Sequence, residues 1–227
     1  SILISTAFGL RVAPEDIPRE GITNITKEDI ICAKQFGFTI KLLAQARRYR
    51  NTLECHVQPA MVPLDHPLAT VKNEFNAVFA KGNALDNVML YGKGAGAMPT
   101  GSAVVGDLLE IARAYAVGTA DKTIPTAVND NVNLKFDGEG QNMYYINLLA
   151  EDMTGVLGKI ATTFGDYGIA VKSFVQNTAS KQSGRYVPLI YILGETTRER
   201  LNDALEEISK FTFVKEIKSV ISVAALD

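Results

Sequence analysis

The apolar positions between residues 143 and 223 switch repeatedly between the period of a strand and that of a helix. Four runs favour strands: "MYYINLLAE", "IAVKSFVQN", "RYVPLIYILGE" and "VKEIKSVISV". Two amphipathic runs favour helices: "MTGVLGKIATTFGDYG", which ends at Gly168, and "TRERLNDALEEISKF", whose charged side is expected to face solvent. Their order along the chain, β-α-β-β-α-β, predicts a small split β-α-β domain.

The first half is predicted as α+β and rich in sheet. In "NITKEDIICAKQFGF", Thr26 is the expected N-cap of a helix, Asp29 stands in for the acid of a capping box, and Gly37 ends the helix. "TIKLLAQARRYRNTLECHVQPAMVP" alternates as two strands ended by Pro59 and Pro63. "NEFNAVFAKGNALDNVMLYG" alternates as two more strands, with "KGN" as the turn between them.

A change of composition divides the chain. A helix predicted over 101–115 is followed by "VGTADKTIPTAVNDNVNLKFDGEG", a polar segment with scattered Pro, Asn and Gly. Such a segment is typical of a linker or a docking arm between domains. We therefore expect a first domain over 1–116, a linker over 117–140 and a second domain over 141–227.

The first ten residues, "SILISTAFGL", are apolar where a chain terminus is usually polar and frayed. The apolar positions are Ile2, Leu3, Ile4, Ala7 and Phe8. This pattern is typical of a buried helix and indicates a sequence cut from a longer protein.

The composition is that of an ordinary globular protein, with 47% hydrophobic and 21% charged residues and a net charge of -2. Such a charge offers no basic patch to nucleic acid or to an anionic membrane, so neither partner is expected. No apolar run reaches the ~18 residues of a membrane span, and no signal peptide is recognisable, which favours the cytoplasm. Cys32 and Cys55 lack metal-ligand spacing; we expect buried reduced thiols and no metal site.

The stretch "VMLYGKGAGAMPTG" matches a loose dinucleotide fingerprint, G-x-G-x-x-A, which starts at Gly92 and ends at Ala97. In a Rossmann domain, the helix after this loop leads to a second strand that ends in an acid about 20 residues on. Here the helix leads into the polar segment instead. The loop is therefore not interpreted as a dinucleotide fingerprint.

Other candidates for chemistry have simpler structural explanations. His56 and His66, the two histidines of the chain, lie beside prolines without a carboxylate cluster, and we assign them no chemistry. Glu20 and Asp29 resemble a catalytic pair, but helix capping explains them. Lys41 is expected on a solvated strand face. The sequence therefore predicts no catalytic residue.

Residues 143–223 resemble an ACT domain, a small-molecule sensor with the ferredoxin-like βαββαβ fold. "EDMTGVLGKI" is similar to the family's D-x-P-G-V-L-x-x-I turn, with Thr154 in the place of proline. The resemblance implies an amino-acid effector whose carboxylate meets the N–H groups of the first helix, whose ammonium group meets Asp152, and whose approach a Cβ at Gly155 would crowd. Packing of the helix on the sheet explains Gly155 and Leu157 equally well. The implied effector site comprises Asp152, Met153, Thr154, Gly155, Val156, Leu157 and Asn177.

Three successive blocks in the first half resemble the middle and C-terminal part of homoserine dehydrogenase. They are "PREGITNITKEDIICAKQFGFTIKLLAQ", "HVQPAMVPLDHPLATVKNEFNAVFAKGN" and "VMLYGKGAGAMPTGSAVVGDLLEIAR", with Lys93 at a position where that glycine loop often has proline or arginine. The resemblance implies a substrate-domain sheet with helices, and a glycine loop near the nicotinamide of the cofactor. Its implied cofactor-binding residues are Gly94, Ala95, Gly96 and Thr100, although packing alone explains Gly92 and Gly96 equally well.

The combined resemblance implies the C-terminal part of an NAD(P)-dependent enzyme that reduces L-aspartate 4-semialdehyde to L-homoserine, in threonine and methionine biosynthesis. The family's Rossmann domain and its catalytic carboxylates and lysines precede a segment similar to "SILISTAFG". We therefore expect the chain alone to be inactive and to bind no cofactor. We further expect feedback by L-threonine and a homodimer formed through both halves. The alternative is a free-standing amino-acid sensor whose first half is a dimerisation scaffold.

Overall fold

The computed structural model describes residues 1–49, 52–120, 133–135, 140–176, 185–224 and 226. The α-helices are α1 (Ile2–Phe8), α2 (Lys27–Gln35), α3 (Ala97–Ala116), α4 (Val156–Asp166) and α5 (Arg198–Ser209), and short 3₁₀ helices are η1 (Pro14–Asp16) and η2 (Pro67–Thr70). The strands are β1 (Phe38–Tyr49), β2 (Thr52–Pro63), β3 (Phe75–Gly82), β4 (Asp86–Lys93), β5 (Asn133–Lys135), β6 (Asn142–Glu151), β7 (Val171–Gln176), β8 (Tyr186–Thr196) and β9 (Val214–Val223).

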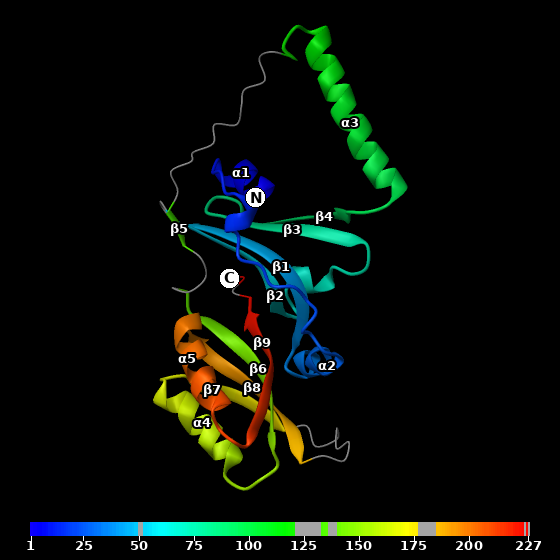
Figure 1. Ribbon diagram of the computed structural model, residues 1–227. Coiled ribbons are helices and arrows are strands. Elements are labelled where there is room, and N and C mark those ends of the chain that lie inside the picture. The colour runs from blue at the N-terminus through cyan, green and yellow to red at the C-terminus, as the bar shows by residue number, and fades with distance from the viewer. Residues whose placement is uncertain (50–51, 121–132, 136–139, 177–184, 225, 227) are drawn as a thin grey trace.

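One sheet runs through both halves of the chain (Figure 1). Its strands follow the order β1-β2-β9-β6-β8-β7, and β5 pairs in parallel with β2. The two halves meet where Ala60 and Met61 of β2 pair in parallel with Ser222 and Val223 of β9. Strands β3 and β4 form a separate two-stranded sheet. The predicted linker therefore contributes a strand, β5; its remaining residues between 121 and 139 lie outside the described residues.

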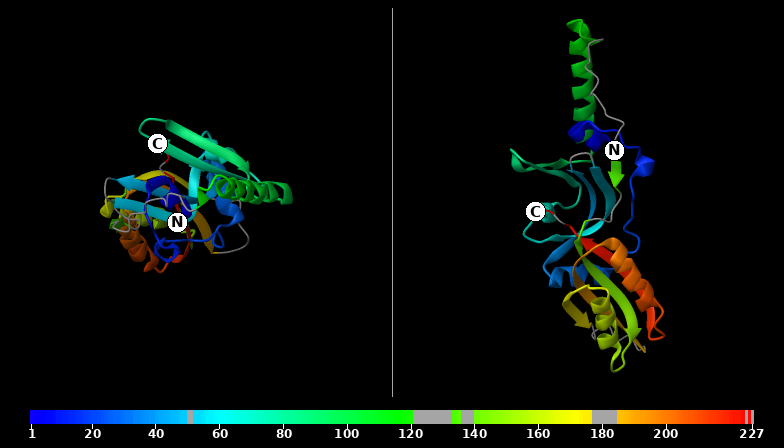
Figure 2. Two further views of the ribbon diagram at one scale, coloured as in Figure 1. Left: turned by 90° about the horizontal axis from the view of Figure 1, so that it is seen from above. Right: turned by 90° about the vertical axis from the view of Figure 1, so that its left-hand side faces the viewer.

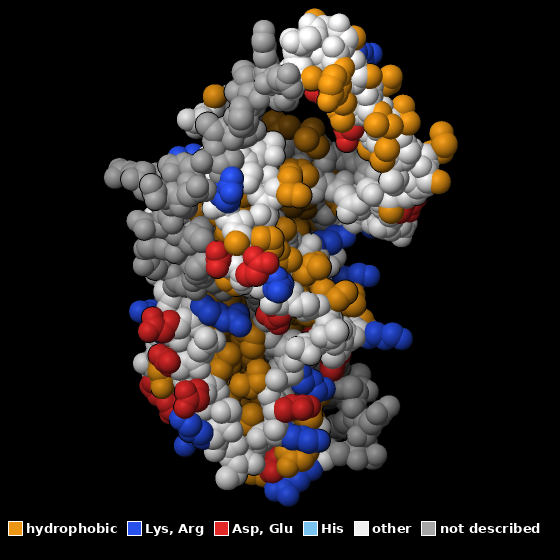
Figure 3. All heavy atoms as spheres, turned by 45° about the horizontal axis from the view of Figure 1, so that its top comes forward, with side chains coloured by type: hydrophobic (Ala, Val, Ile, Leu, Met, Phe, Trp, Pro, Cys, Tyr) orange, Lys and Arg blue, Asp and Glu red, His pale blue; other side chains and the backbone are white. Residues whose placement is uncertain are grey.

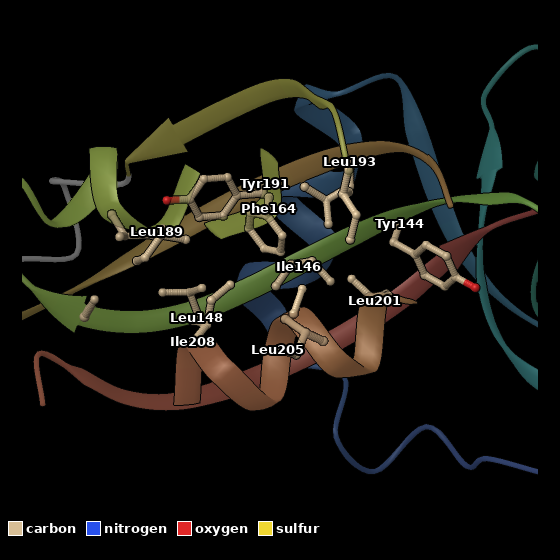
Figure 4. Packing of buried hydrophobic residues seen from close by; sticks show 14 of the residues in the cluster. Tyr144, Ile146, Leu148, Phe164, Leu189, Tyr191, Leu193, Leu201, Leu205 and Ile208 are labelled. Atoms are coloured by element: carbon tan, nitrogen blue, oxygen red, sulfur yellow. The ribbon is translucent and has the colours of Figure 1, made fainter. Parts of the chain in front are cut away.

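The four strands β9, β6, β8 and β7, here called the C-terminal sheet, have the predicted antiparallel order of a split β-α-β domain. Helices α4 and α5 cover one face, and their apolar side chains meet those of the strands in a closed core (Figure 4). Its fully buried members include Ile146, Leu148, Phe164, Tyr191 and Leu201. The amphipathic patterns of the sequence are thus confirmed, because each helix buries its apolar stripe against the sheet.

Helix α2 of the first half packs on the opposite face of the C-terminal sheet. Side chains alternate between the two faces of a strand, so Tyr145 and Ile190 point away from the core to which Tyr144 and Tyr191 belong. The former pair packs with Cys32 of α2 in a second cluster of buried side chains. The C-terminal sheet is therefore the middle layer between α4 and α5 on one side and a helix from the other half of the chain on the other.

Helix α2 forms where the sequence predicts it. The Thr26 side chain accepts a hydrogen bond from the Asp29 backbone N–H at 3.2 Å, and the Thr26 backbone N–H donates to the Asp29 carboxylate at 2.9 Å. This is a complete capping box, so the shorter side chain of aspartate suffices in the place of glutamate. Gly37 follows the helix directly, as expected.

The prediction that Pro59 ends a strand is wrong. Strand β2 continues through Pro59, which lies opposite Leu42 of β1. The N–H of Val57 donates to the carbonyl of Pro18, so this side of β2 points away from β1, and Pro59, two residues on, points the same way. A proline is tolerated there because the bonds to β1 do not need its missing N–H.

Helix α1 is only partly buried within the described chain. Ile4 packs with Leu10 and Leu53 in a small cluster, whereas Ile2 is 82% exposed and Leu3 60% exposed. The apolar start of the sequence is therefore a helix, as predicted, with one apolar side that the described residues do not cover.

Helix α3 and the β3–β4 hairpin form the most open part of the molecule. Helix α3 stands away from the other elements (Figures 1 and 2), and none of its 20 residues is buried against the described part of the chain. Apolar side chains run along it in the space-filling view (Figure 3). Those exposed include Met98, Val104, Val105, Leu108, Leu109, Ile111 and Tyr115.

Two boundaries in this part differ from the sequence prediction. Helix α3 begins at Ala97 rather than at residue 101, because Pro99 fits the first turn of a helix, where its missing N–H costs no bond. The hairpin turn lies two residues later than "KGN", at residues 83–85: Lys81 and Gly82 still pair within β3, and Gly82 faces Asp86. None of the described helices has the length and apolar composition that a membrane span requires.

Candidate functional site

The predicted cofactor loop lies at the junction of the β3–β4 hairpin and α3. Gly94 and Ala95 follow β4, Gly96 is the N-cap of α3, and Thr100 lies in the first turn of that helix. The Thr100 N–H donates to the carbonyl of Gly96 at 3.1 Å. The structure thus brings these residues together on one exposed turn, with no side-chain cap on the first N–H groups of α3.

Gly94 and Gly96 are glycines for two different local reasons. A Cβ on Gly94 would lie 1.8 Å from the Nδ2 atom of Asn76, so this position is filled by a neighbouring strand. Gly96 has φ of +124°, a backbone conformation that side chains with a Cβ rarely adopt. Packing and conformation therefore account for both glycines, while the exposed turn stays open to a ligand.

The predicted effector residues lie on the turn from β6 to α4, here called the effector turn (residues 152–157). Gly155 is the N-cap of α4 with φ of +87°, and its carbonyl accepts the N–H of Lys159 at 2.9 Å. Val156 is buried under the helix, whereas Met153 and Leu157 are 56% and 39% exposed. The turn thus presents the start of a helix between two exposed apolar side chains.

The reason for Gly155 differs from the one expected. A Cβ at this position would meet nothing within 4 Å, so the residue does not leave room for a ligand in the described chain. The positive φ requires glycine instead, because other residues adopt it only with strain. A larger side chain here would therefore distort the first turn of α4 itself.

Asp152 has a partner within its own chain. Its carboxylate oxygen Oδ1 accepts a hydrogen bond from the Nε2 of Gln176 at 3.1 Å, which joins the effector turn to the end of β7. The neighbouring Glu151 is 5% exposed and pairs with Arg185 at 2.8 Å. Asn177, the remaining predicted effector residue, lies outside the described residues. The end of β7 thus approaches the turn without a second subunit.

A buried polar cluster surrounds Asp29, for which the sequence analysis predicts only a capping role. Its oxygen Oδ1 accepts hydrogen bonds at 2.8 Å from the Tyr145 hydroxyl, the Asn147 side-chain amide and the Ser219 hydroxyl. Its oxygen Oδ2 accepts from the backbone N–H and the hydroxyl of Thr26. These five residues, here called the Asp29 cluster, connect α2 with β6 and β9.

The cluster keeps Asp29 ionised despite its burial. Desolvation acts to raise the pKa of Asp29, but the hydrogen bonds from Asn147, Thr26 and Ser219 outweigh it, so the pKa lies below its ordinary value. Burial and the adjacent carboxylate raise the pKa of Tyr145, which therefore remains a donor. A carboxylate with this many donors is a structural anchor rather than a proton carrier.

The remaining candidates of the sequence have local contacts. His66 accepts the N–H of Leu68 through Nδ1 at 3.2 Å and caps η2. The ring of His56 lies 3.0 Å from the side-chain oxygen of Gln45. Lys41 does not lie on a solvated face: it is half-buried, donates to the carbonyl of Val71, and its pKa is lowered by burial and by Lys72.

Both cysteines are buried thiols, as predicted, and neither is in a disulfide. Burial and the nearby carboxylates Glu28 and Asp29 raise the pKa of Cys32. Within the described part of the chain, no group of three or more His, Cys, Asp or Glu side chains has the arrangement of a metal site.

The fold defines a class before any comparison: an α+β protein whose second half is a ferredoxin-like βαββαβ domain, joined to the first half by a shared sheet. Comparison with known families agrees with this division. Residues 1–109 match the homoserine dehydrogenase family, and residues 144–210 match the ACT domain family. Residues 1–109 therefore form a domain of the homoserine dehydrogenase family, and residues 144–210 form an ACT domain.

Named relatives align along nearly the whole chain. The chain is 31% identical over 223 residues to the homoserine dehydrogenase of Bacillus subtilis (strain 168). This alignment covers 98% of the chain and 51% of the Bacillus protein. The chain is 34% identical over 226 residues to the homoserine dehydrogenase of Corynebacterium glutamicum. This alignment covers 97% of the chain and 49% of the Corynebacterium protein. The chain thus spans about half the length of the curated relatives it matches.

A solved structure confirms the fold. The crystal structure of a homoserine dehydrogenase from Thiobacillus denitrificans superposes with a TM-score of 0.86 at 30% sequence identity. The match covers 100% of this chain and 52% of that one. The open α3 segment and the C-terminal sheet therefore belong to one known architecture.

Proposed function

We propose that this chain is the substrate-domain and regulatory part of an NAD(P)-dependent homoserine dehydrogenase, which converts L-aspartate 4-semialdehyde to L-homoserine in threonine and methionine biosynthesis. The observation that carries the proposal is the order of the two family matches within one chain, together with named relatives that align along nearly its whole length. We divide it at the predicted boundaries, 1–116, 117–140 and 141–227.

The glycine loop is our candidate for contact with the cofactor. The exposed first N–H groups of α3 lack a side-chain cap and are suited to an oxygen of the nicotinamide end, next to Gly94, Ala95, Gly96 and Thr100. The nicotinamide supplies the hydride, and the loop would position it. Hydride transfer also needs a proton donor held beside the substrate, and the family's donors lie in the half of the relatives that this chain does not span. We therefore expect these 227 residues alone not to turn over homoserine.

The exposed apolar side chains favour a homodimer. A single chain leaves Leu108 and Tyr115 of α3, and Leu90 of β4, between 60% and 73% exposed, and extended apolar surfaces of this kind mark interaction sites. Strands β3 and β4 also leave two sheet edges, which a second copy could pair. Light scattering at micromolar concentration should give twice the chain mass of 24.6 kDa.

The effector turn is our candidate site for feedback by L-threonine. The N–H groups at the start of α4 suit the carboxylate of an amino acid, and Asp152 suits its ammonium group, so the two ends of a zwitterion meet opposite charges. Gln176, already bonded to Asp152, stands beside the place of the ligand side chain. The exposed Met153 and Leu157 would be partly covered by it.

Thermal unfolding in the presence of amino acids tests the effector. A ligand at 100 times its dissociation constant stabilises a folded protein by roughly 2.7 kcal/mol, which shifts a melting temperature by several degrees. We expect saturating threonine to give this shift and isoleucine, methionine and lysine to give less. Absence of a threonine shift would leave the ACT domain as a dimerisation module.

A further inference from the structure

The two halves of the chain meet where β2 pairs with β9 and where α2 packs on the C-terminal sheet. Beyond the short pairing of β2 with β9, Gln58 donates to the hydroxyl of Ser222 at 3.1 Å. All other described polar contacts between α2 and the C-terminal sheet surround Asp29, apart from the ion pair of Lys218 with Glu28 at 3.7 Å. Asp29 is fully buried, so water cannot replace a lost partner without entering the interface.

Strand β6 connects this cluster directly with the effector turn. Asn147 lies four residues before Glu151, the last residue of β6, which is about 13 Å along a strand. Strand β6 is paired on both sides: its register with β8 is regular from Tyr144 to Glu151, whereas its register with β9 shifts after Asn147 and after Leu149, so displacement passes along β6 together with β8. A change at Asp152 therefore reaches Asn147 along a continuous strand.

Asp29 is the only described anchor of the Asn147 side chain. The Asn147 amide nitrogen donates to Asp29, whereas its amide oxygen is buried and has no partner among the described residues. Any shift of β6 must either carry Asp29 along or leave both ends of the amide unpaired, which is costly in a buried site. Only Phe36 and Gly37 separate α2 from β1, so a shift of α2 also shifts the β1–β2 hairpin.

We propose that the Asp29 cluster couples the effector turn to the first half of the chain, with Asp29 as the positioning residue. The regulatory part of this inference rests on the proposed function. When an effector orders the turn, β6 and α2 are held together through Asp29. By linkage, the free energy with which the effector stabilises the turn also disfavours local opening of α2. The path is specific: it passes through Asn147 and Ser219, and not through Gln58 and Ser222.

Hydrogen exchange measured by mass spectrometry on the whole chain tests the coupling. We expect threonine to slow exchange in the effector turn and also in α2, in α2 by about fivefold or more, the low end for coupled sites. In Asp29→Asn the turn should still respond and α2 should not. Ser219→Ala, a milder change for the case that Asp29→Asn folds poorly, should reduce the α2 response.

Ser222→Ala is the matched control. Ser219 and Ser222 are both buried serines of β9, 6% and 7% exposed, but only Ser219 donates to Asp29. The α2 response to threonine should survive Ser222→Ala. The coupling is refuted if α2 does not respond in the unaltered chain while the turn does, or if Ser219→Ala and Ser222→Ala give the same response.

A separate arm keeps the coupling testable if threonine does not bind, which would refute the proposed effector alone. Gly155→Ala strains the turn through its positive φ without any ligand. Exchange should then rise in the turn and in α2 of the otherwise unaltered chain, and only in the turn when Asp29→Asn is added. A rise confined to the turn in both backgrounds would overturn the coupling.

Discussion

The apolar side chains of the C-terminal sheet are buried, whereas those of α3 are exposed. Both faces of the C-terminal sheet are covered within one chain, by α4 and α5 on one side and by α2 on the other. Helix α3 has comparable apolar content, yet Leu108 is 60% and Met98 82% exposed. The first region completes its own core, and the second offers its apolar surface to something outside the described chain.

This difference separates two sources of stability. Burial of apolar area is worth roughly 25 cal/mol per Å² only where that area leaves water. In the isolated chain, closed cores such as that of the C-terminal sheet therefore supply this stabilisation, and α3 contributes through its own backbone hydrogen bonds. The apolar side chains of α3 contribute to stability by burial only when a partner surface covers them.

The largest expected effect is the loss of a ring from the C-terminal core. Phe164 is fully buried on α4 and packs edge-to-face on Tyr191, with ring centroids 5.5 Å apart. Phe164→Ala should lower the free energy of unfolding by about 3–5 kcal/mol through lost burial and a residual cavity. Urea unfolding followed by circular dichroism measures this, and a loss under about 1 kcal/mol would mean that the core is not closed as described.

The next effect concerns the interface that closes the second face. Asp29→Ala removes the shared acceptor and leaves three buried donors, on Tyr145, Asn147 and Ser219, without a partner. We expect a loss of about 3 kcal/mol in unfolding free energy, because a buried donor left without an acceptor costs about 1–3 kcal/mol. Tyr145→Phe, which removes one donor and keeps the ring, is the control and should cost clearly less.

Acid should remove the contribution of Asp29. Its pKa in the folded chain is lowered by hydrogen bonds, so the ionised form stabilises the fold above the unfolded pKa of about 3.9, and this stabilisation is lost as pH falls through the folded pKa. The stability difference between the unaltered chain and Asp29→Asn should shrink between neutral pH and strongly acidic pH. Burial raises the pKa values of the neighbouring Cys32 and Tyr145, so both stay protonated throughout this range and add nothing to the difference. A difference that is independent of pH would contradict an ionised Asp29.

The smallest effect should come from α3. Leu108→Ala keeps helix propensity and removes a side chain that is already 60% exposed. The free energy of unfolding of the monomeric chain should therefore change by no more than about 0.5 kcal/mol. Dilution to a concentration at which light scattering detects only monomers isolates this effect. A loss as large as that of Phe164→Ala would show that α3 is buried in the monomer, and would remove the contrast between the two regions.

Local patterns made the C-terminal half predictable. Its strands and helices follow from periodicities within stretches of about ten residues, and all six appear in the expected order. The capping box of α2 was equally accessible, because Thr26 and Asp29 are three residues apart. In each case the residues that fix the structure are neighbours in the sequence.

The second role of Asp29 could not be predicted in this way. Its partners Tyr145, Asn147 and Ser219 lie 116 to 190 residues further along the chain, and nothing in their sequence context singles them out. The reason for Gly94 is likewise a distant contact, with Asn76 across the hairpin. The exposure of α3 depends on what covers it, which its amphipathic pattern does not specify.

Calorimetric titration of the chain with L-threonine tests the central claim, that the effector turn senses this amino acid, most directly. We expect heat from one site per chain. This heat should be lost in Gly155→Val, where the side chain strains a backbone at φ of +87°, and retained in Gly158→Ala, where a Cβ on the same helix meets nothing within 4 Å. Both variants should first be shown to be folded by their circular dichroism. Absence of heat with the unaltered chain, or equal binding by a folded Gly155→Val, would contradict the claim.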